Sequence, residues 1–227
     1  MTIAVLGGTG DQGLGIAIRF VQAGENVIIG SRKAEKAEQA VEKVKKLLKD
    51  NSLPNLKGLN NEDAASKADI LILTVPILAQ KPTLDSVKEH VKDKIFIDAT
   101  VPLQSNIGGT SMTYFSLWEG SAAERTEAIL KGTNVKVVSA FNNISSSSLM
   151  KFDSEIDCDC LVSGDDNEAK AIAMELIEKI PGIKCVDAGP LEQARTVERI
   201  TALLIGLNIR YKTHYGGLRI TGLPDKK

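Results

Sequence analysis

The stretch Thr2–Gly13, TIAVLGGTGDQG, determines the predicted fold. Its first half contains Ile3–Leu6, a short apolar run typical of a strand that is buried on both faces of a parallel sheet. Its second half, Gly8–Gly13, fits the pattern G-x-G-x-x-G. The apolar residues that follow have helical spacing: Leu14, Ala17, Ile18 and Val21. Strand, glycine turn and helix in this order are the fingerprint of a dinucleotide-binding βαβ unit.

The glycines of this turn have separate expected roles. Gly8 and Gly10 allow a tight turn and a close approach of the backbone to a pyrophosphate, and Gly13 lets the helix pack against the strand. The helix N-terminus offers N–H groups and a positive dipole end to the phosphates. A glycine turn that binds nothing is the alternative, and the surrounding strand and helix disfavour it.

The second expected strand, Asn26–Ile29, ends without a carboxylate. An NAD-binding fold places an Asp or Glu there, which accepts hydrogen bonds from the ribose 2′-OH. Here Ser31 and Arg32 offer donors that suit a phosphate. The sequence therefore predicts NADP rather than NAD. Lys36 lies close by, although the lysine-rich surface of its helix is also explained by solvation alone.

The composition is that of an ordinary globular protein: 227 residues, 43% hydrophobic and 25% charged, with a formal net charge of -1. This charge gives no bias toward nucleic acid or an anionic membrane, and no apolar run approaches the roughly 20 residues of a membrane span. We therefore expect a soluble cytoplasmic protein. Cys158 and Cys160 are expected to be buried on one face of a strand rather than to bind a metal.

The alternation of strands and helices predicts an α/β fold, a Rossmann-type doubly wound parallel sheet, over residues 1–141. A small C-terminal α+β domain is expected over residues 142–227. Strands are expected at 56–59, 69–74, 95–97, 135–140, 160–162, 183–186 and 218–220, and the end of the chain is expected to fray. Helices are expected at 62–67, 83–91, 121–131, from 165 to 180 and from 190 to 208. The last helix has more apolar residues than one neighbour covers, so it packs either on a second subunit or within its own chain.

Loops that follow buried strands are expected to line a ligand crevice, because the carboxyl ends of parallel strands meet at one edge of the sheet. Thr74–Pro76 is one such loop, and Asp98 is expected to hold the next one by hydrogen bonds to its backbone. Residues 103–119 contain Tyr114, Phe115 and Trp118, and we expect this long excursion to pack down as a lid or an interface.

The residues after the strand at 135–140 are FNNISSSS, from Phe141 to Ser148. In a dinucleotide-binding fold this turn lies near the nicotinamide end of the crevice, where paired asparagines offer donors and acceptors without charge. The serines favour a helix N-terminus that faces the site, with a flexible linker as the alternative.

Acid and base groups for catalysis are scarce in the sequence. No Ser–His–Asp arrangement, HExxH motif, CxxC pair or carboxylate dyad can be identified, and His90 and His214 are most simply surface residues. Dehydrogenases of alcohols or amines commonly need a group that moves the proton of the substrate. Hydride exchange between two cofactors needs mainly a correctly stacked pair of rings.

A set of short motifs occurs along nearly the whole chain: GGTGDQG, GSRKAEK, ILTVP, IDATVP, GSAAE, AFNNIS and DAGPLEQAR. In this combination the chain resembles the NADP-dependent oxidoreductases that use the deazaflavin coenzyme F420, especially those of methanogenesis. The resemblance implies reversible hydride transfer between the deazaflavin C5 and the nicotinamide C4, with NADP(H) on the Rossmann domain and the deazaflavin in the cleft beside the C-terminal domain. We also expect small-molecule partners and a homo-oligomer, a dimer through the C-terminal domain.

The resemblance implies roles for individual residues. Thr9 and its neighbours hold the pyrophosphate, and Ser31, Arg32 and Lys36 hold the 2′-phosphate. Some members carry a histidine where this chain has Asn142, so only ring positioning is expected of Asn142 and Ile144. The full set of residues expected to bind the cofactors is Gly8, Thr9, Gly10, Asp11, Gln12, Gly13, Ser31, Arg32, Lys36, Thr74, Val75, Pro76, Val101 and Ala140.

Two other functions stay open at this point. An NADP-linked reductase of a small organic substrate, such as an imine, predicts a proton donor in the cleft. A regulatory protein that senses the redox state of NADP without turnover predicts an exposed recognition surface and no room for a second planar cofactor.

Overall fold

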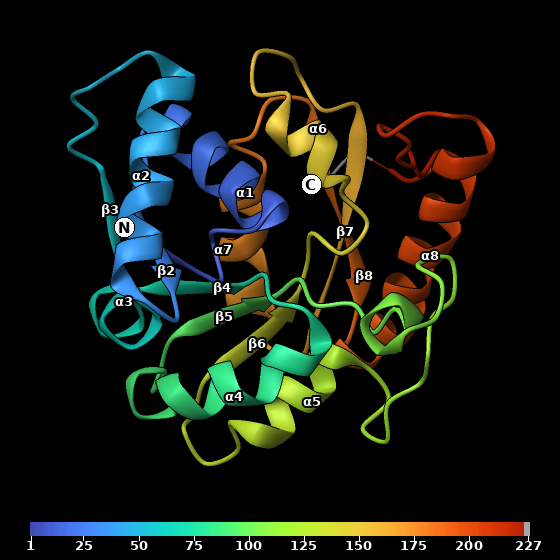
Figure 1. The fold of residues 1–227 in the computed structure, drawn as a ribbon. Coiled ribbons are helices and arrows are strands. Elements are labelled where there is room, and N and C mark those ends of the chain that lie inside the picture. The colour runs from blue at the N-terminus through green and yellow to red at the C-terminus, as the bar shows by residue number, and fades with distance from the viewer. Residues whose placement is uncertain (225–227) are drawn as a thin grey trace.

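The computed structural model describes residues 1–224, and its centre is one 8-stranded sheet in the order β3-β2-β1-β4-β5-β6-β7-β8 (Figure 1). The strands are β1 (Thr2–Leu6), β2 (Asn26–Ser31), β3 (Leu56–Asn60), β4 (Ile70–Leu73), β5 (Ile95–Asp98), β6 (Lys136–Ser139), β7 (Cys158–Gly164) and β8 (Ile183–Gly189). Neighbouring strands are parallel except for β6 and β7, which are antiparallel. This arrangement confirms the predicted α/β, Rossmann-type doubly wound sheet.

Helices cover both faces of the sheet (Figure 1). The longer ones are α1 (Asp11–Gln22), α2 (Ala34–Leu48), α3 (Asn61–Lys67), α4 (Ile77–Val87), α5 (Ala122–Ile129), α7 (Asn167–Ile177) and α8 (Ala194–Arg210). The α6 helix (Ser146–Met150) and the 3₁₀ turns η1 (Lys88–His90), η2 (Gln104–Ile107) and η3 (Leu191–Gln193) are short. The helices α1, α2, α6 and α7 share one apolar core with the sheet, and α3, α4 and the end of α5 share the other.

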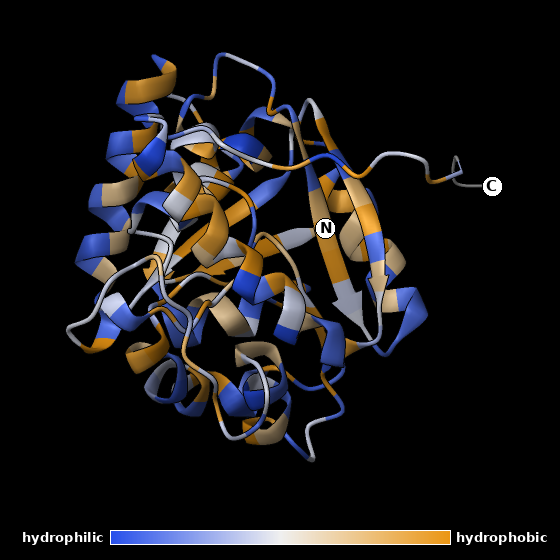
Figure 2. Ribbon diagram, turned by 90° about the vertical axis from the view of Figure 1, so that its right-hand side faces the viewer, coloured by the Kyte–Doolittle hydropathy of each residue, from blue (hydrophilic) through white to orange (hydrophobic). Residues whose placement is uncertain are grey.

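The central strand β1 shows why the sheet needs two covered faces. Ile3 and Val5 lie in the first core, whereas Ala4 and Leu6 lie in the second, because successive side chains of a strand point to opposite faces. All four side chains are fully buried. In Figure 2 the strands are largely hydrophobic, and hydrophilic residues gather on the outer helices. The uninterrupted apolar run therefore marks a strand between two helical layers.

The C-terminal part of the chain joins the same sheet. The β7 strand pairs with β6 through Ser139 and Val138, and β8 pairs with β7 along its length. Residues 142–224 thus add the last two strands of the sheet together with α6, α7 and α8. The division of the chain into domains of residues 1–141 and 142–227 stays a prediction.

Two predicted elements differ from the structure. The helix expected at 83–91 begins earlier, at Ile77, and contains Pro82, and η1 forms its expected end. Its first turns are held by the buried side chains of Ile77 and Gln80, and Gln80 donates to Asp98, Ala122 and Thr126. Residues 218–220 form no strand. The backbone N–H of Asp159 does donate to the carbonyl oxygen of Leu218, but Ile220 donates to the Asp159 side chain instead of continuing a ladder. The predicted fraying end includes residues 225–227, which lie outside the described residues.

Expectations about cysteines and aromatic residues had different outcomes. Cys158 and Cys160 are free, buried and on the same face of β7, as predicted. In the 103–119 segment Tyr114 reaches α8, because its hydroxyl lies 3.3 Å from the Glu198 carboxylate. Trp118 is 100% exposed, so it does not pack within its own chain, and the expectation of a lid or an interface stays a prediction. Within residues 1–224, no helix combines the length and the apolar character that crossing a membrane requires.

Candidate active site

Two adjoining cavities lie over the carboxyl ends of the central strands. The larger cavity, of about 890 Å³, extends from the start of α1 to α8 and the residues after it. The smaller cavity, of about 500 Å³, lies at the ends of β1 and β2. Both are lined by Gly10 and by Thr74–Pro76, so the two cavities meet at the glycine turn. A crevice in this position is where open α/β sheets bind their ligands.

The glycine turn is closed by backbone hydrogen bonds and by very close packing. The N–H of Gly8 donates to the carbonyl oxygens of Val5 and Gly30, at 3.2 and 3.0 Å. A Cβ on Gly8 would lie 2.8 Å from the Val5 oxygen, and one on Gly13 would lie 2.4 Å from Oγ1 of Thr74. Gly8 and Gly13 are buried and line neither cavity, so they act by packing.

The start of α1 presents unpaired donors to the point where the cavities meet. Within the described residues, the backbone N–H groups of Asp11, Gln12 and Gly13 have no acceptor in the chain, as expected for a first helical turn. The preceding Gly10 has no other atom closer than 4.0 Å to the place of a Cβ. Free N–H groups beside an open backbone suit a diphosphate. Thr9 lines the smaller cavity.

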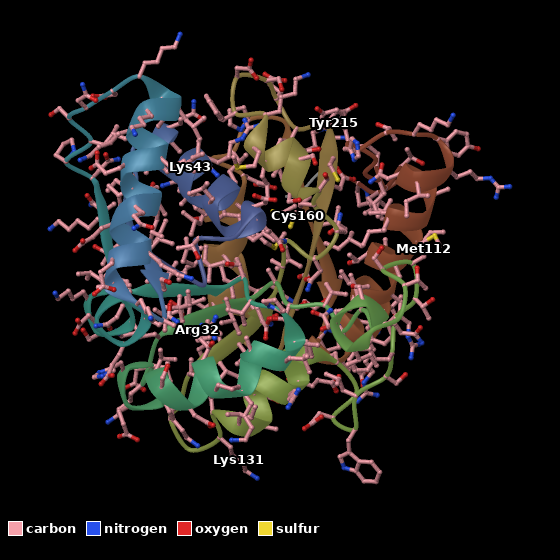
Figure 3. All side chains as sticks on the ribbon, in the orientation of Figure 1. Arg32, Lys43, Met112, Lys131, Cys160 and Tyr215 are labelled. Carbon is pink, nitrogen blue, oxygen red and sulfur yellow. The ribbon has the colours of Figure 1, made fainter. Side chains whose placement is uncertain are left out.

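The smaller cavity is positively charged. Its lining includes Arg32, Lys33 and Lys36 with the buried Ser31, and the described residues that line it include no carboxylate. Arg32 is labelled in Figure 3, close to the start of α4. The structure therefore brings together all three residues that were predicted to hold a 2′-phosphate. Asn61 was not predicted, and its Oδ1 accepts a hydrogen bond of 3.3 Å from the Gly7 N–H.

The larger cavity is lined by the other two predicted strand-end segments and by the serine-rich turn. Val101 follows β5, and Asn142–Ser147 follow β6. The serines form the start of α6, where the Ser145 hydroxyl accepts a hydrogen bond from the Ser148 N–H. The prediction of a helix N-terminus is therefore confirmed, and the alternative of a flexible linker is wrong. Ala140, also predicted to contact a cofactor, is fully buried and lines neither cavity.

Asn142 is held on three sides. Its Oδ1 accepts from Oγ of Ser139 at 3.0 Å, and its Nδ2 donates to the Thr100 carbonyl oxygen at 3.2 Å. Its own carbonyl oxygen accepts from Oγ1 of Thr201 at 2.7 Å. The residue is only 3% exposed. Asn142 thus fixes the shape of the cavity wall, with Ile144 beside it in the lining.

Asp98 has the structural role that the sequence predicts. Its Oδ1 accepts from the Thr100 N–H at 2.7 Å, and its Oδ2 accepts from Gln80 and Thr126. Burial raises the pKa of this carboxyl, and the surrounding hydrogen bonds oppose that effect. Asp98 therefore holds the Thr100–Val101 segment in place.

Several site residues were missed. The α8 helix lines the larger cavity with Thr201, Leu204, Ile205 and Asn208, and the chain after it adds Lys212–His214 and Gly216. His214 is exposed, as expected of a surface residue, and it also lines the larger cavity. Polar residues interrupting an apolar helix were the available signal. The residues after α8 could not be placed from the sequence, because their position depends on long-range hydrogen bonds. One of these is donated by Ser145 Oγ to the His214 carbonyl oxygen.

A second missed feature is a buried carboxyl beside the cavity-lining loop. Glu198 of α8 is fully buried, and it accepts hydrogen bonds from the N–H groups of Ala122, at 2.9 Å, and Ala123, at 3.3 Å. Burial is the largest cause that raises the pKa of Glu198, to about 8, and the nearby Asp98 raises it further. Burial and the Glu198 charge likewise raise the pKa of Tyr114. Glu198 lines neither cavity, so it connects α8, α5 and the 103–119 segment.

The fold and these two cavities define the class: a Rossmann-type protein with a candidate dinucleotide site at the glycine turn and a larger cavity beside that site. A family model for coenzyme F420-dependent NADP oxidoreductases matches residues 2–102. The F420-dependent NADP reductase of Methanothermobacter thermautotrophicus is 52% identical over 100% of this chain and 97% of the relative. That of Methanocaldococcus jannaschii is 45% identical over 98% of this chain and 99% of the relative. The chain belongs to the family of F420-dependent NADP reductases.

Solved structures agree on the fold. A crystal structure from Arthrobacter sp. FB24, described as a candidate F420-dependent NADP reductase, superimposes with a TM-score of 0.83 at 23% identity, over 98% of this chain and 100% of that one. An imine reductase from Bacillus cereus gives a TM-score of 0.61 at 16% identity, over 93% of this chain and 63% of that one. At these identities the likeness concerns the fold alone.

Proposed function

We propose that this protein transfers a hydride reversibly between NADP(H) and the deazaflavin coenzyme F420. The single observation that carries the proposal is the junction of the two cavities at Gly10 and Thr74–Pro76. A nucleotide that lies across this junction presents one end to the larger cavity, which has room for a second planar ring system beside it. The nearly full-length relatives named for this pair of substrates support the same function.

The smaller cavity and the glycine turn bind the nucleotide in this proposal. The free N–H groups of Asp11 and Gln12 bind the pyrophosphate, because they meet the smaller cavity at Gly10. Arg32 and Lys36 bind the 2′-phosphate, with Ser31 as a further donor. The lack of a lining carboxylate supports NADP over NAD, since a carboxylate would repel a phosphate.

The larger cavity orients the rings. When the two coenzymes are bound, they supply the chemistry, a hydride that moves between the nicotinamide C4 and the deazaflavin C5. Asn142 and Ile144 position the rings through the rigid wall between β6 and α6. Leu204 and Ile205 of α8 provide apolar lining that excludes water. Because the hydride passes directly between two ring carbons, the role assigned to these side chains is to position the rings.

The two alternative functions are not favoured. Reduction of an imine is disfavoured by the nearly full-length relatives, which are named for coenzyme F420 and NADP, and the buried carboxyls Asp98 and Glu198 do not line the cavity. A sensor without turnover is disfavoured by the volume of the larger cavity and by the full-length relatives.

The test is anaerobic mixing of the protein and NADPH with oxidised coenzyme F420, followed by the loss of the deazaflavin's visible absorbance. We expect rapid loss with NADPH and much slower loss with NADH. A folded protein that binds NADP but gives no loss of absorbance would contradict the proposal.

A dimer is part of the proposal. Leu203 and Leu207 of α8, which do not line the cavity, are 60% and 39% exposed, and Met112 of the 103–119 segment lies beside Gly206 on that helix. An apolar surface of this kind suits a second copy of the chain. Light scattering should give the mass of a dimer, and Leu207→Glu should shift it toward the monomer. A cytoplasmic location and the absence of nucleic-acid partners stay predictions of the sequence.

A further inference from the structure

The far end of the larger cavity is built by the end of α8 and the residues that follow it. The N–H of Thr213 donates to the Asn208 carbonyl oxygen at 2.9 Å, and the N–H of Gly216 donates to Asn208 Oδ1 at 2.8 Å. From the opposite wall, Ser145 Oγ donates to the carbonyl oxygen of His214 at 2.5 Å. The segment that carries Lys212 is therefore fixed on two sides.

This end of the cavity carries an uncommitted positive charge. Among residues 1–224, no acceptor or carboxylate contacts the side chain of Lys212, which lines the cavity. Two other cations nearby are engaged: the Lys151 ammonium lies 5.5 Å from the Tyr215 ring centroid, and Arg219 pairs with Asp157. Arg210 is exposed and does not line the cavity. An unpaired ammonium on a cavity wall suits an anionic ligand group.

The opposite charge is at the other end. Asp11 is the one carboxylate among the described residues that line the larger cavity, and it lies at the start of α1, next to the smaller cavity. Arg32, which lines the smaller cavity, and Tyr215, which follows His214 in the chain, lie well apart in Figure 3. The cavity therefore has a cationic end away from the nucleotide, with His214 beside Lys212 on its rim.

The length of α8 separates this end from the proposed ring junction. Thr201 contacts Asn142, and the helix continues to Arg210. At about 1.5 Å per residue, this part of the helix spans roughly 14 Å. Lys212 follows the end of this helix, on the cavity wall beyond the turn at Asn142, so a group that it holds fits an extension of the ligand that carries the rings.

We propose that Lys212, with His214 as a second donor, binds an anionic group, a phosphate or a carboxylate, on the side chain of the deazaflavin coenzyme. This inference rests on the proposed function. It assigns the far end of the larger cavity to recognition of the coenzyme's side chain, and it predicts selection of a charged deazaflavin over an uncharged one.

The test compares Lys212→Gln with the wild-type protein, using the full coenzyme and a deazaflavin riboside that lacks the phosphate and carboxylates. Titration calorimetry gives the Kd of each oxidised deazaflavin, and anaerobic kinetics gives KM and kcat. For Lys212→Gln we expect Kd and KM for the full coenzyme to rise about tenfold, as for loss of one charge-assisted contact, with kcat kept. Binding of the riboside should not change, and Lys212→Glu should weaken binding of the full coenzyme further.

Arg210→Gln is the matched control, because it removes one exposed cation close by that does not line the cavity. It should bind both deazaflavins with the affinity of the wild type. This result would distinguish a direct contact of Lys212 with the ligand from a general effect of positive charge on the surface. Equal affinity of wild type and Lys212→Gln for the full coenzyme would overturn the inference, as would an equal loss for the riboside. If the wild-type protein oxidises NADPH with neither deazaflavin, the proposed function itself fails.

Discussion

Oγ1 of Thr201 donates a hydrogen bond of 2.7 Å to the main-chain carbonyl oxygen of Asn142. This bond joins the middle of α8 to the turn after β6, two segments that form facing walls of the larger cavity. Asn142 is almost completely buried, so its carbonyl oxygen has little access to water when the partner is removed. The position of the turn at Asn142 therefore depends on the position of α8.

Thr201→Val removes this donor while keeping the side-chain shape. An unsatisfied buried carbonyl group costs about 1–3 kcal/mol, so we expect a loss of stability in that range, measured by urea unfolding. Turnover with the deazaflavin should fall, because α8 is no longer held at a fixed position relative to the turn at Asn142. Thr201→Ser keeps the hydroxyl and should retain most of the activity. Identical turnover of the Val variant and the wild type would show that α8 does not position the site.

Asn142→Ala should lower turnover more than nucleotide affinity. Its amide bridges Ser139 and Thr100 behind the cavity wall, whereas the predicted phosphate-binding groups lie in the smaller cavity. We expect kcat to fall about tenfold or more, as for a misplaced ring pair, while the Kd of NADP stays within about twofold. Stopped-flow absorbance and calorimetry measure the two quantities. Unchanged turnover would exclude the positioning role.

Arg32→Ala should weaken NADP binding far more than NAD binding. The guanidinium lines the smaller cavity together with Lys36, and only NADP carries the 2′-phosphate that these cations would contact. Loss of a charge-assisted bond costs about 1.5–3 kcal/mol, which is roughly a tenfold to a hundredfold rise in Kd for NADP. Lys46→Ala, on the exposed side of α2, is the control. An equal loss for both nucleotides would disprove the 2′-phosphate assignment.

Gly13→Ala should destabilise the fold and impair the nucleotide site together. The new Cβ would lie 2.4 Å from Thr74 Oγ1 and 2.7 Å from the Gly8 Cα, so α1 must move away from β1 and β4. Overpacking of this kind costs about 1–3 kcal/mol. Gly24→Ala offers a contrast, because nothing lies within 4 Å of its Cβ position, although its φ of +83° adds backbone strain. Thermal unfolding measures the loss of stability in both variants, and NADP titration should show a loss of affinity for Gly13→Ala alone.

Glu198 should make stability depend on pH. Its pKa is raised from 4.5 to about 8 in the folded state, so the folded protein binds more protons than the unfolded chain between these values. The stabilisation is fully present below pH 4.5 and is lost as the pH rises through 8. Within that window the slope approaches about 1.4 kcal/mol per pH unit.

Urea unfolding from pH 5 to 9 measures this effect, with Glu198→Gln as the variant that cannot titrate. The difference in unfolding free energy between variant and wild type should grow in favour of the variant as the pH rises. Glu192→Gln is the control, because it removes an exposed carboxylate that lies just before α8. Its unfolding free energy should depend on pH in the same way as that of the wild type. Parallel curves for Glu198→Gln and the wild type would show that Glu198 is ionised throughout.

Much of the fold and the nucleotide site could be predicted from the sequence, because both depend on local patterns. The apolar run at Ile3–Leu6 requires two covered faces, and Gly13 is explained by the packing distance between α1 and β4. Ser31 and Arg32 follow a strand directly, so their place at the sheet edge is fixed by chain connectivity. The helix start at Ile77 was missed, because packing of Ile77 and Gln80 overrides the local effect of Pro82.

The sequence by itself therefore determined the doubly wound sheet, the glycine turn and the place of the cationic residues Arg32 and Lys36 beside it. Only the tertiary structure decided the far wall of the larger cavity, where Thr201 meets Asn142 and Ser145 meets the backbone of His214. It also decided that Glu198 is buried against the start of α5. The physical reason is sequence distance: strand and turn patterns arise from neighbouring residues, whereas these contacts join segments whose approach depends on the packing of the whole chain.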